Sequence, residues 1–333
     1  MASAMLGVCL ASAIMTLRAE ARPTRVNLGT LAPRGSTYHR SLLSMAEKWR
    51  QAPGGGVRLV IYPDGTQGGE SDMVRLMRVG TLHAGLLTAN GLSDIDPAVA
   101  GLQNMPMMFR NLDEVDYVVE NMQKMLEERL LAKGFIVLFW VDAGWVRYFS
   151  KERMIHPEDL KIMKAFVWAG DLEQVDIMNR GGYNPVPLET GEILPGFQTG
   201  LITAVSVPPI FALAGQLDTR APYMINLNYA PLVGAAVITK SMWDRIPGVA
   251  RRTLVEAAAE AGREIKANSR QESIDSVAAM QKRVLTVQPV TPELEAEWRK
   301  AAELLYPEIR GRVVPADMFD EVQRLLGEYR AGG

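Results

Sequence analysis

The chain has 333 residues but only one cysteine, Cys9, and three histidines, His39, His83 and His156. A lone thiol cannot form an intrachain disulfide, so stability has to come from the packed core. No histidine has a second histidine or a cysteine at the spacing of a metal site. The sequence therefore predicts neither a disulfide framework nor a metal centre. We expect His39 at an exposed position early in a helix.

Common catalytic motifs are missing as well. The glycine-rich segment at residues 65–69 lacks the Lys-Ser or Lys-Thr pair of a phosphate-binding loop, and no strand is followed by G-x-G-x-x-G. Neither G-x-S-x-G nor H-E-x-x-H occurs. Because no acid, base or nucleophile stands out, the sequence predicts that the protein is not an enzyme and carries no cofactor.

The charges are balanced, since 36 Lys and Arg against 38 Asp and Glu give a formal net charge of -2. The cationic residues are scattered, and even the pair Arg251 and Arg252 is followed by Glu256 and Glu260 at helical spacing. The sequence therefore predicts no basic patch for nucleic acid or for an acidic membrane surface.

Residues 4–17 form an apolar run that is too short to span a bilayer but suits the core of a signal peptide. Ala19, Glu20 and Ala21 follow it and supply small residues for cleavage before Arg22. No basic residue precedes the run, which indicates a true start upstream of the printed one, and a buried N-terminal helix is the alternative. We expect residues 1–21 to be a signal peptide and the mature chain to be periplasmic.

Strand-like and helix-like segments alternate from residue 25 onward, which predicts an α/β fold with parallel strands. At 333 residues the chain is long enough for two domains. The expected strands are residues 25–31, 57–62 and 84–87, and the expected helices are residues 37–50, 71–79 and 112–132, the last of them capped by Asn111.

Two long segments are expected to connect the domains. Residues 136–150 have the pattern of an unusually long strand with Gly144 inside it, where a strand can bend as it passes between domains. Residues 248–285 contain no proline and are rich in alanine, which predicts a helix of about 55 Å that braces both domains. We assign residues 22–145 and 226–265 to the first domain, and residues 146–225 and 266–333 to the second.

Four motifs follow one another between residues 157 and 200. They are Pro-Glu-Asp-Leu-Lys at 157–161, Ala-Phe-Val-Trp at 165–168, Gly-Tyr-Asn-Pro-Val-Pro at 182–187 and Phe-Gln-Thr-Gly at 197–200. The same ordered set of motifs includes three earlier segments, at 26–36, 62–70 and 105–110. With these motifs the chain resembles the DctP-type solute-binding proteins of tripartite ATP-independent periplasmic (TRAP) transporters, over about residues 25–330.

The resemblance implies a two-lobed periplasmic binding protein fold with an inter-domain cleft, hinge strands and the long helix against both lobes. It implies capture of a small-molecule ligand in the cleft and delivery to the membrane subunits of the transporter, without catalysis. A branch of the family with a tryptophan after this strand is associated with an additional tetratricopeptide-repeat lipoprotein, so we expect such a partner as well.

The chain departs from the family pattern at three contact positions. Members usually hold an organic acid with an arginine where this chain has Phe166, with a second basic residue at Val146 and an asparagine at Val207. A bidentate arginine is the efficient way to hold a desolvated carboxylate. The loss of these contacts predicts a small, substantially apolar ligand.

The candidate ligand-binding residues come from both domains. They are Ala32, Thr88, Asn90 and Trp145 in the first domain, and Val146, Phe166, Trp168 and Val207 in the second. Trp168 ends its predicted strand, where side chains commonly project into the cleft of an open α/β sheet. For each aromatic residue taken alone, core packing is the alternative.

Arg147 leaves a second hypothesis open. In a regular strand its side chain points away from that of Val146, to the opposite face. A bulge at Gly144 would instead turn Arg147 into the cleft and restore an anion site, and the ligand would then be an organic acid. A periplasmic enzyme or a sensor on the same scaffold is the remaining alternative.

Overall fold

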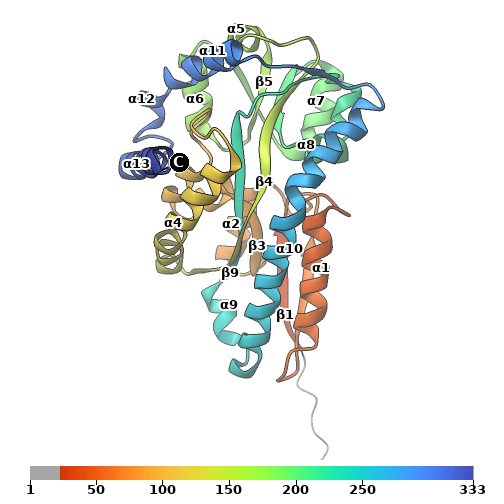
Figure 1. Ribbon diagram of the computed structural model, residues 1–333. Coiled ribbons are helices and arrows are strands. Elements are labelled where there is room, and N and C mark those ends of the chain that lie inside the picture. Colours follow the sequence, from red (N-terminus) through yellow and green to blue (C-terminus); the bar gives the residue numbers. More distant parts are fainter. Residues whose placement is uncertain (1–22, 333) are drawn as a thin grey trace, which may run out of the picture.

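The computed structural model describes residues 23–332, so the predicted signal peptide at residues 1–21 lies outside the described residues. One long strand, β4 (Phe135–Ser150), runs through both halves of the molecule (Figure 1). The strand is rich in aromatic and β-branched residues, which favour extended backbone. It confirms the crossing strand that the sequence predicts at residues 136–150.

The first half of the sheet holds four further strands. Their order toward β4 is β2 (Val57–Tyr62), β1 (Thr24–Thr30), β3 (Ala84–Thr88) and β9 (Ala230–Thr239). β1 is parallel to β2 and β3, whereas β9 is antiparallel to β3 and to β4. The associated helices are α1 (Thr37–Arg50), α2 (Glu70–Arg78), α3 (Ala89–Ser93), η1 (Pro97–Leu102), α4 (Leu112–Ala132) and α9 (Lys240–Arg245).

The second half continues from the other end of β4. Here the order is β4, β7 (Ala204–Val207), β5 (Lys164–Trp168) and β6 (Asn184–Leu188), while β8 (Tyr223–Ile225) joins β4 to β10 (Thr286–Gln288). β7, β5 and β6 are mutually parallel and run antiparallel to β4. The associated helices are α5 (Pro157–Lys161), α6 (Leu172–Arg180), η2 (Thr190–Glu192), α7 (Ile193–Thr199), α8 (Pro209–Ala214) and η3 (Leu217–Thr219).

These strand directions decide where a ligand can meet both halves. β1 and β3 run in the same direction as β4, so their carboxyl ends point toward the second half. β5 and β7 run in the opposite direction, so their carboxyl ends point back toward the first half. The loops after four strands therefore face one another across the junction, and the carboxyl ends of parallel strands are where α/β proteins bind ligands.

A long helix, α10 (Gly248–Gln281), packs along α1 and β4 and reaches α8 in the second half (Figure 1). Its 34 residues span about 51 Å at 1.5 Å per residue. Small side chains let it approach the sheet closely, because a Cβ added at Gly262 would lie 2.7 Å from Cβ of Phe139. The predicted bracing helix is confirmed, and it ends four residues before the predicted bound.

The C-terminal helices are α11 (Pro292–Glu303), α12 (Tyr306–Ile309) and α13 (Ala316–Gly332). α13 packs against α4 and η1 of the first half, and Phe319, Val322 and Leu326 belong to their core cluster. The division into two domains stays a proposal, and this packing favours placing α13 with the first domain rather than with residues 266–315. None of the helices within residues 23–332 is long and apolar enough to cross a membrane.

Local sequence signals account for several of these bounds. The predicted bounds of α1, β2 and α4 are confirmed, and the side chain of Asn111 caps α4 by accepting from the N–H of Glu114 at 2.8 Å. The prediction for His39 is confirmed in its place early in a helix and wrong in its exposure. Its side chain is buried, and its Nδ1 accepts a hydrogen bond from the N–H of Gly35 at 3.2 Å.

Candidate functional site

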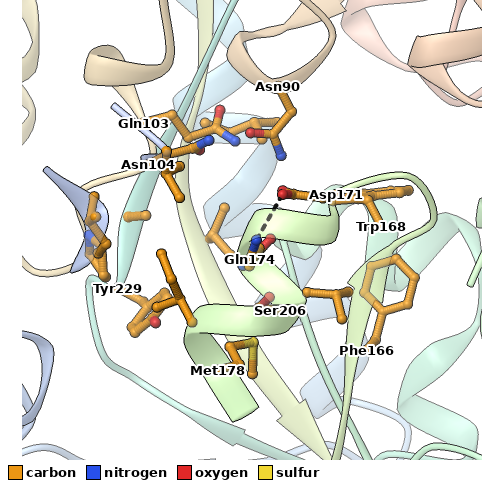
Figure 2. A pocket seen from close by; sticks show the side chains of 18 of the residues that line it. Asn90, Gln103, Asn104, Phe166, Trp168, Asp171, Gln174, Met178, Ser206 and Tyr229 are labelled. Atoms are coloured by element: carbon orange, nitrogen blue, oxygen red, sulfur yellow. Dashed lines mark hydrogen bonds between the residues drawn. The ribbon is translucent and has the colours of Figure 1, made fainter. Parts of the chain in front are cut away.

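A cavity of about 120 Å³ lies at the junction between the two halves (Figure 2). It brings together four of the predicted ligand-binding residues, Asn90, Val146, Phe166 and Trp168. Figure 2 shows three amide side chains of the first half on one side of the cavity, those of Asn90, Gln103 and Asn104. On the other side lies α6 of the second half, with Asp171, Gln174 and Met178.

Two polar groups give this cavity its electrostatic character. The side-chain oxygen of Asn90 is buried and has no hydrogen-bond partner among residues 23–332. Burial raises the pKa of Asp171, and the nearby charges of Asp94 and Glu173 raise it further, although the carboxylate caps α6 by accepting from the N–H of Gln174 at 3.1 Å. Because no cation among residues 23–332 pairs with Asp171, this cavity does not suit the charged end of an anion.

The predicted residues Ala32 and Thr88 line a smaller cavity of about 50 Å³. Thr88 is held by Glu70, whose carboxylate accepts from the N–H of Thr88 at 2.7 Å, from its hydroxyl at 2.5 Å and from the N–H of Gly91 at 3.0 Å. Burial raises the pKa of Glu70, and these hydrogen bonds oppose the rise. Glu70 therefore fixes the turn after β3 that carries Thr88 and Asn90.

A third cavity, of about 260 Å³, is lined by Val207. Leu31 and Asp64 line it from the first half, and Thr190 and Phe211 line it from the second. Most of the remaining wall is aliphatic, contributed by Pro33, Ile193, Leu194, Ala214 and Leu217. The hydroxyl of Thr190 is buried without a partner within the described residues, so this largely apolar space keeps one free polar contact.

The predicted residue Trp145 lines none of these three cavities. It packs in the core cluster that holds α4 and α13. Phe166 and Trp168 contact each other edge to face, with ring centroids 4.8 Å apart, and together cover the carboxyl end of β5. Phe166 is buried in the core cluster of the second half, so for this residue core packing accounts for most of the side chain.

β4 contains a bulge at Gly144. Asp142 pairs with Val233 of β9, and Trp145 pairs with Pro231, so three steps along β4 oppose two along β9. The extra residue reverses the alternation of side chains. Gly144 has φ +72, the left-handed region that glycine adopts without strain. The core confirms the reversal, since Ala143 and Trp145 pack in different clusters although they are two residues apart.

After the bulge, Arg147 lies opposite Val207 of β7, and Tyr148 lies opposite Ser206. Residues opposite each other in a sheet share a face. Ala165 of β5 pairs with Ala204, so three positions further on Trp168 neighbours Val207 in the same row. Arg147, Val207 and Trp168 therefore share one face at the end of the sheet, and Val207 opens that face onto the 260 Å³ cavity. The bulge that the second hypothesis requires is confirmed.

Arg147 has no partner for its charge among residues 23–332. One guanidinium nitrogen, Nη1, is buried without any hydrogen bond. Burial without a counter-charge lowers the pKa of Arg147 to about 10, so the side chain is still cationic at neutral pH. A buried charge is costly unless it is paired and hydrogen-bonded. The geometry can therefore bind an anion that reaches this face of the sheet.

Sequence reasoning missed Glu70, Asp64, Thr190 and Phe211 as lining residues. The glycine-rich turn at 65–69 was a usable signal for the first two, because it precedes α2 and brings the chain next to the second half. A Cβ added at Gly69 would lie 2.7 Å from a carboxylate oxygen of Glu189, and one at Gly65 would lie 4.0 Å from Cβ of Thr190. Nothing in the sequence around Phe211 indicated that its side chain lines a cavity.

Comparisons with known proteins identify the family and the fold. The model of the family described as bacterial extracellular solute-binding protein, family 7 (DctP) matches residues 28–311. The 2,3-diketo-L-gulonate-binding periplasmic protein of Escherichia coli K12 is 25% identical over 239 residues, which is 70% of this chain and 72% of that protein.

Solved structures share the fold. A TRAP periplasmic solute-binding protein from Xanthobacter autotrophicus Py2 with bound β-D-galacturonate has a TM-score of 0.82 at 18% identity, covering 91% of this chain and 99% of that one. A TRAP periplasmic solute-binding protein from Ralstonia eutropha H16 with bound (S)-2-acetolactate has a TM-score of 0.83 at 19% identity and covers 91% and 99%.

Proposed function

The chain belongs to bacterial extracellular solute-binding protein family 7, and from that premise we propose that it captures a small organic monocarboxylate with an apolar body. Its general role is that of the solute-binding component of a TRAP transporter, outside the cytoplasm. The proposal adds the class of ligand, and it rests on one observation: Nη1 of the Arg147 guanidinium is buried without a partner among residues 23–332.

The anion end of the ligand is assigned to Arg147. An arginine offers a planar fork of donors that matches a carboxylate, and hydrogen bonds between two charged groups are roughly twice as strong as neutral ones. Because the cation has no partner in the described chain, a carboxylate would satisfy a group that is otherwise buried and uncompensated. The relatives named above bind galacturonate, 2-acetolactate and diketogulonate, all of which carry a carboxylate.

The body of the ligand is assigned to the 260 Å³ cavity, whose wall is mostly apolar. Ordinary ligand sites begin at about 300 Å³, so this volume suits a small molecule better than a lipid. From the apolar residues Phe166, Val146 and Val207 the sequence predicts a small, substantially apolar ligand. The bulge favours the organic-acid alternative, with the apolar residues around the body of the ligand rather than around its charge.

Capture requires the two halves to separate. Phe211 of α8 lines both the 50 Å³ and the 260 Å³ cavities and packs against the core clusters of both halves, so it fills the junction beside Val207. A ligand reaches the buried Nη1 of Arg147 only when this contact opens. Closure around the ligand would then rest on contacts to both halves, because only differential affinity shifts such an equilibrium.

The proposed function also includes export of the chain and its partners at the membrane. We propose that the mature protein begins near Arg22, that it delivers its ligand to the TRAP membrane subunits, and that a tetratricopeptide-repeat lipoprotein is an additional partner. Arg22 and the residues before it lie outside the described part of the chain. N-terminal sequencing of the periplasmic fraction tests the first point, and co-purification with the membrane subunits tests the second.

Calorimetry with matched ligands tests the ligand class. We would titrate 3-phenylpropionate and 4-methyl-2-oxopentanoate beside their neutral amides, with succinate and oleate for comparison. The proposal expects both acids to bind at least about 100-fold more tightly than the amides, and Arg147→Met to remove that difference. The variant Arg58→Met, at an exposed position of β2, is the matched control and should bind as the wild type does.

Two outcomes would overturn the proposal. Tight binding of oleate or of the amides that is insensitive to Arg147→Met would support a wholly apolar ligand instead. Conversion of a bound acid to a different compound, detected by NMR of the solution after incubation, would support an enzyme on this scaffold.

A further inference from the structure

Five hydrogen bonds converge on Asp142, the residue two positions before Gly144. Its Oδ1 accepts from the N–H of Gly144 at 3.0 Å and from Nε of Arg270 at 3.0 Å, and its Oδ2 accepts from Nη2 of Arg270 at 2.9 Å. Its backbone carbonyl accepts from the hydroxyls of Tyr38 at 2.7 Å and Ser269 at 2.8 Å. Residues of α1, α10 and β4 itself thus hold Asp142, the last paired residue before the bulge; we call these contacts the clamp.

The clamp is anchored on the first half. Arg270 of α10 also donates to both carboxylate oxygens of Asp116 in α4, at 3.1 and 2.7 Å. Glu272, two residues further along α10, accepts from the N–H of Thr37 at 3.0 Å. The position of Asp142 is therefore fixed relative to α1, α4 and α10.

The clamp acts on the bulge itself, beside the pairing of β4 with β9. A Cβ at Gly144 would meet no atom within 4 Å, so side-chain packing does not fix the glycine. Its position is fixed by the hydrogen bond from its N–H to Asp142 and by the pairing of Asp142 and Trp145 with β9. Counted from Asp142, a strand without the extra residue would place Val146 where Arg147 now lies, because one step reverses the face.

We propose that Asp142 is a positioning residue for ligand binding. Together with Arg270 it holds the bulge in the geometry in which the side chain of Arg147 lies on the same face of the sheet as Val207. The proposal rests on the proposed function, since it assigns a role to the geometry that presents the anion-binding cation. It predicts that loosening the clamp impairs recognition of the charge of the ligand and spares recognition of its apolar body.

Two single variants disturb the bulge in different ways. Asp142→Asn keeps the shape of the side chain and an oxygen for the N–H of Gly144 but loses the charge that pairs with Arg270. Gly144→Ala keeps the clamp but introduces a Cβ at φ +72. Alanine is strained in this left-handed backbone conformation, even though no neighbouring atom would touch its Cβ. Gly134→Ala is a matched control, because Gly134 also has a left-handed φ, +86, with no atom within 4 Å, and lies just before the first residue of β4, far from the bulge.

A third variant moves the cation by one residue. The double substitution Val146→Arg with Arg147→Val keeps composition and net charge but puts the arginine on the face of Ser206, toward the 120 Å³ cavity where Asp171 lies. The proposal expects this variant to fold and to lose the preference for acids over amides.

The readout is the ratio of acid affinity to amide affinity for 3-phenylpropionate and its amide, measured by calorimetry on the full mature chain. We expect Asp142→Asn and Gly144→Ala to lower this ratio at least tenfold, with the amide affinity within twofold of wild type, and Gly134→Ala to leave it unchanged. An equal fall for acid and amide would reveal general loosening and overturn the positioning role, as would an unchanged ratio. If the wild type itself shows no acid preference, the proposed function fails first, so the two failures are distinguishable.

Discussion

Two arginines lie on either side of the Gly144 bulge, and their surroundings are opposite. Arg270 contacts β4 before the bulge and donates to two carboxylates, Asp142 and Asp116, at distances between 2.7 and 3.1 Å. Arg147 follows the bulge by three residues, is likewise partly buried, and has a buried guanidinium nitrogen without any partner in the described chain.

The difference separates an arginine that serves the fold from one that serves a ligand. The charge of Arg270 is paired with carboxylates of the protein, so these ion pairs already contribute to the unfolding free energy of the ligand-free chain. The charge of Arg147 is not matched, so the folded chain is less stable than it would be with an apolar side chain there, and an anion from outside can recover that loss. The two side chains should therefore respond to substitution with opposite signs.

The largest effect is expected from Arg270→Met. Removing the cation leaves the buried carboxylate of Asp142 without its ion-pair partner, which typically costs about 3–5 kcal/mol of unfolding free energy, whereas Asp116 keeps its ion pair with Lys266. Urea denaturation followed by circular dichroism measures the loss. Arg263→Met, on an exposed position of the same helix, is the control and should change stability by less than about 0.5 kcal/mol. A loss no larger than the control's would mean that the clamp contributes little.

Arg147→Met should have the opposite sign. In the absence of ligand, the apolar side chain removes a buried donor without a partner, and we expect a gain of about 1–3 kcal/mol in unfolding free energy. The same denaturation experiment checks it on ligand-free protein, prepared by unfolding and refolding. A destabilised variant would indicate that Arg147 has a structural partner and would remove the contrast with Arg270.

Trp168 sharpens the contrast from the ligand's side. It neighbours Val207 in the same row but lines the 120 Å³ cavity and not the 260 Å³ one, so Trp168→Ala should weaken binding of an acid and of its amide equally, by only about 1 kcal/mol. Parallel titrations measure both affinities. A loss confined to the acid would mean that Trp168 acts through Arg147 and not as an apolar wall.

The smallest effect concerns pH and a third arginine. Burial alone would raise the pKa of Glu114, but hydrogen bonds from Arg330 and from the N–H of Arg110 outweigh it and lower the pKa. A lowered carboxylate pKa gives stability that is present above the unfolded value of 4.5 and is lost as pH falls through the folded value. Acid denaturation should therefore be less steep in Glu114→Gln. An equally steep profile would show that other carboxylates dominate.

Much of the scaffold follows from local patterns in the sequence. The bounds of α1, β2 and α4 are set by amphipathic periodicity, caps and glycine breaks that lie within a few residues of each element. The length of α10 follows from a run without proline. The family follows from motifs whose order is preserved over most of the chain.

The site was less accessible to sequence reasoning, because its geometry depends on pairing between distant strands. Whether Arg147 shares a face with Val207 is decided by the register of β4 against both β9 and β7, some 60 to 90 residues away. Gly144 indicated that the strand can bend but not that it gains a residue. Likewise Glu70 reaches the turn after β3 only through tertiary packing.

A crystal structure of the protein with its tightest-binding acid tests the central claim most directly. The account predicts that the ligand carboxylate lies within about 3 Å of the guanidinium of Arg147, on the face shared with Val207, with the body of the ligand in the cavity beside Phe211. A ligand whose carboxylate lies elsewhere while Arg147 stays without an anion would contradict it.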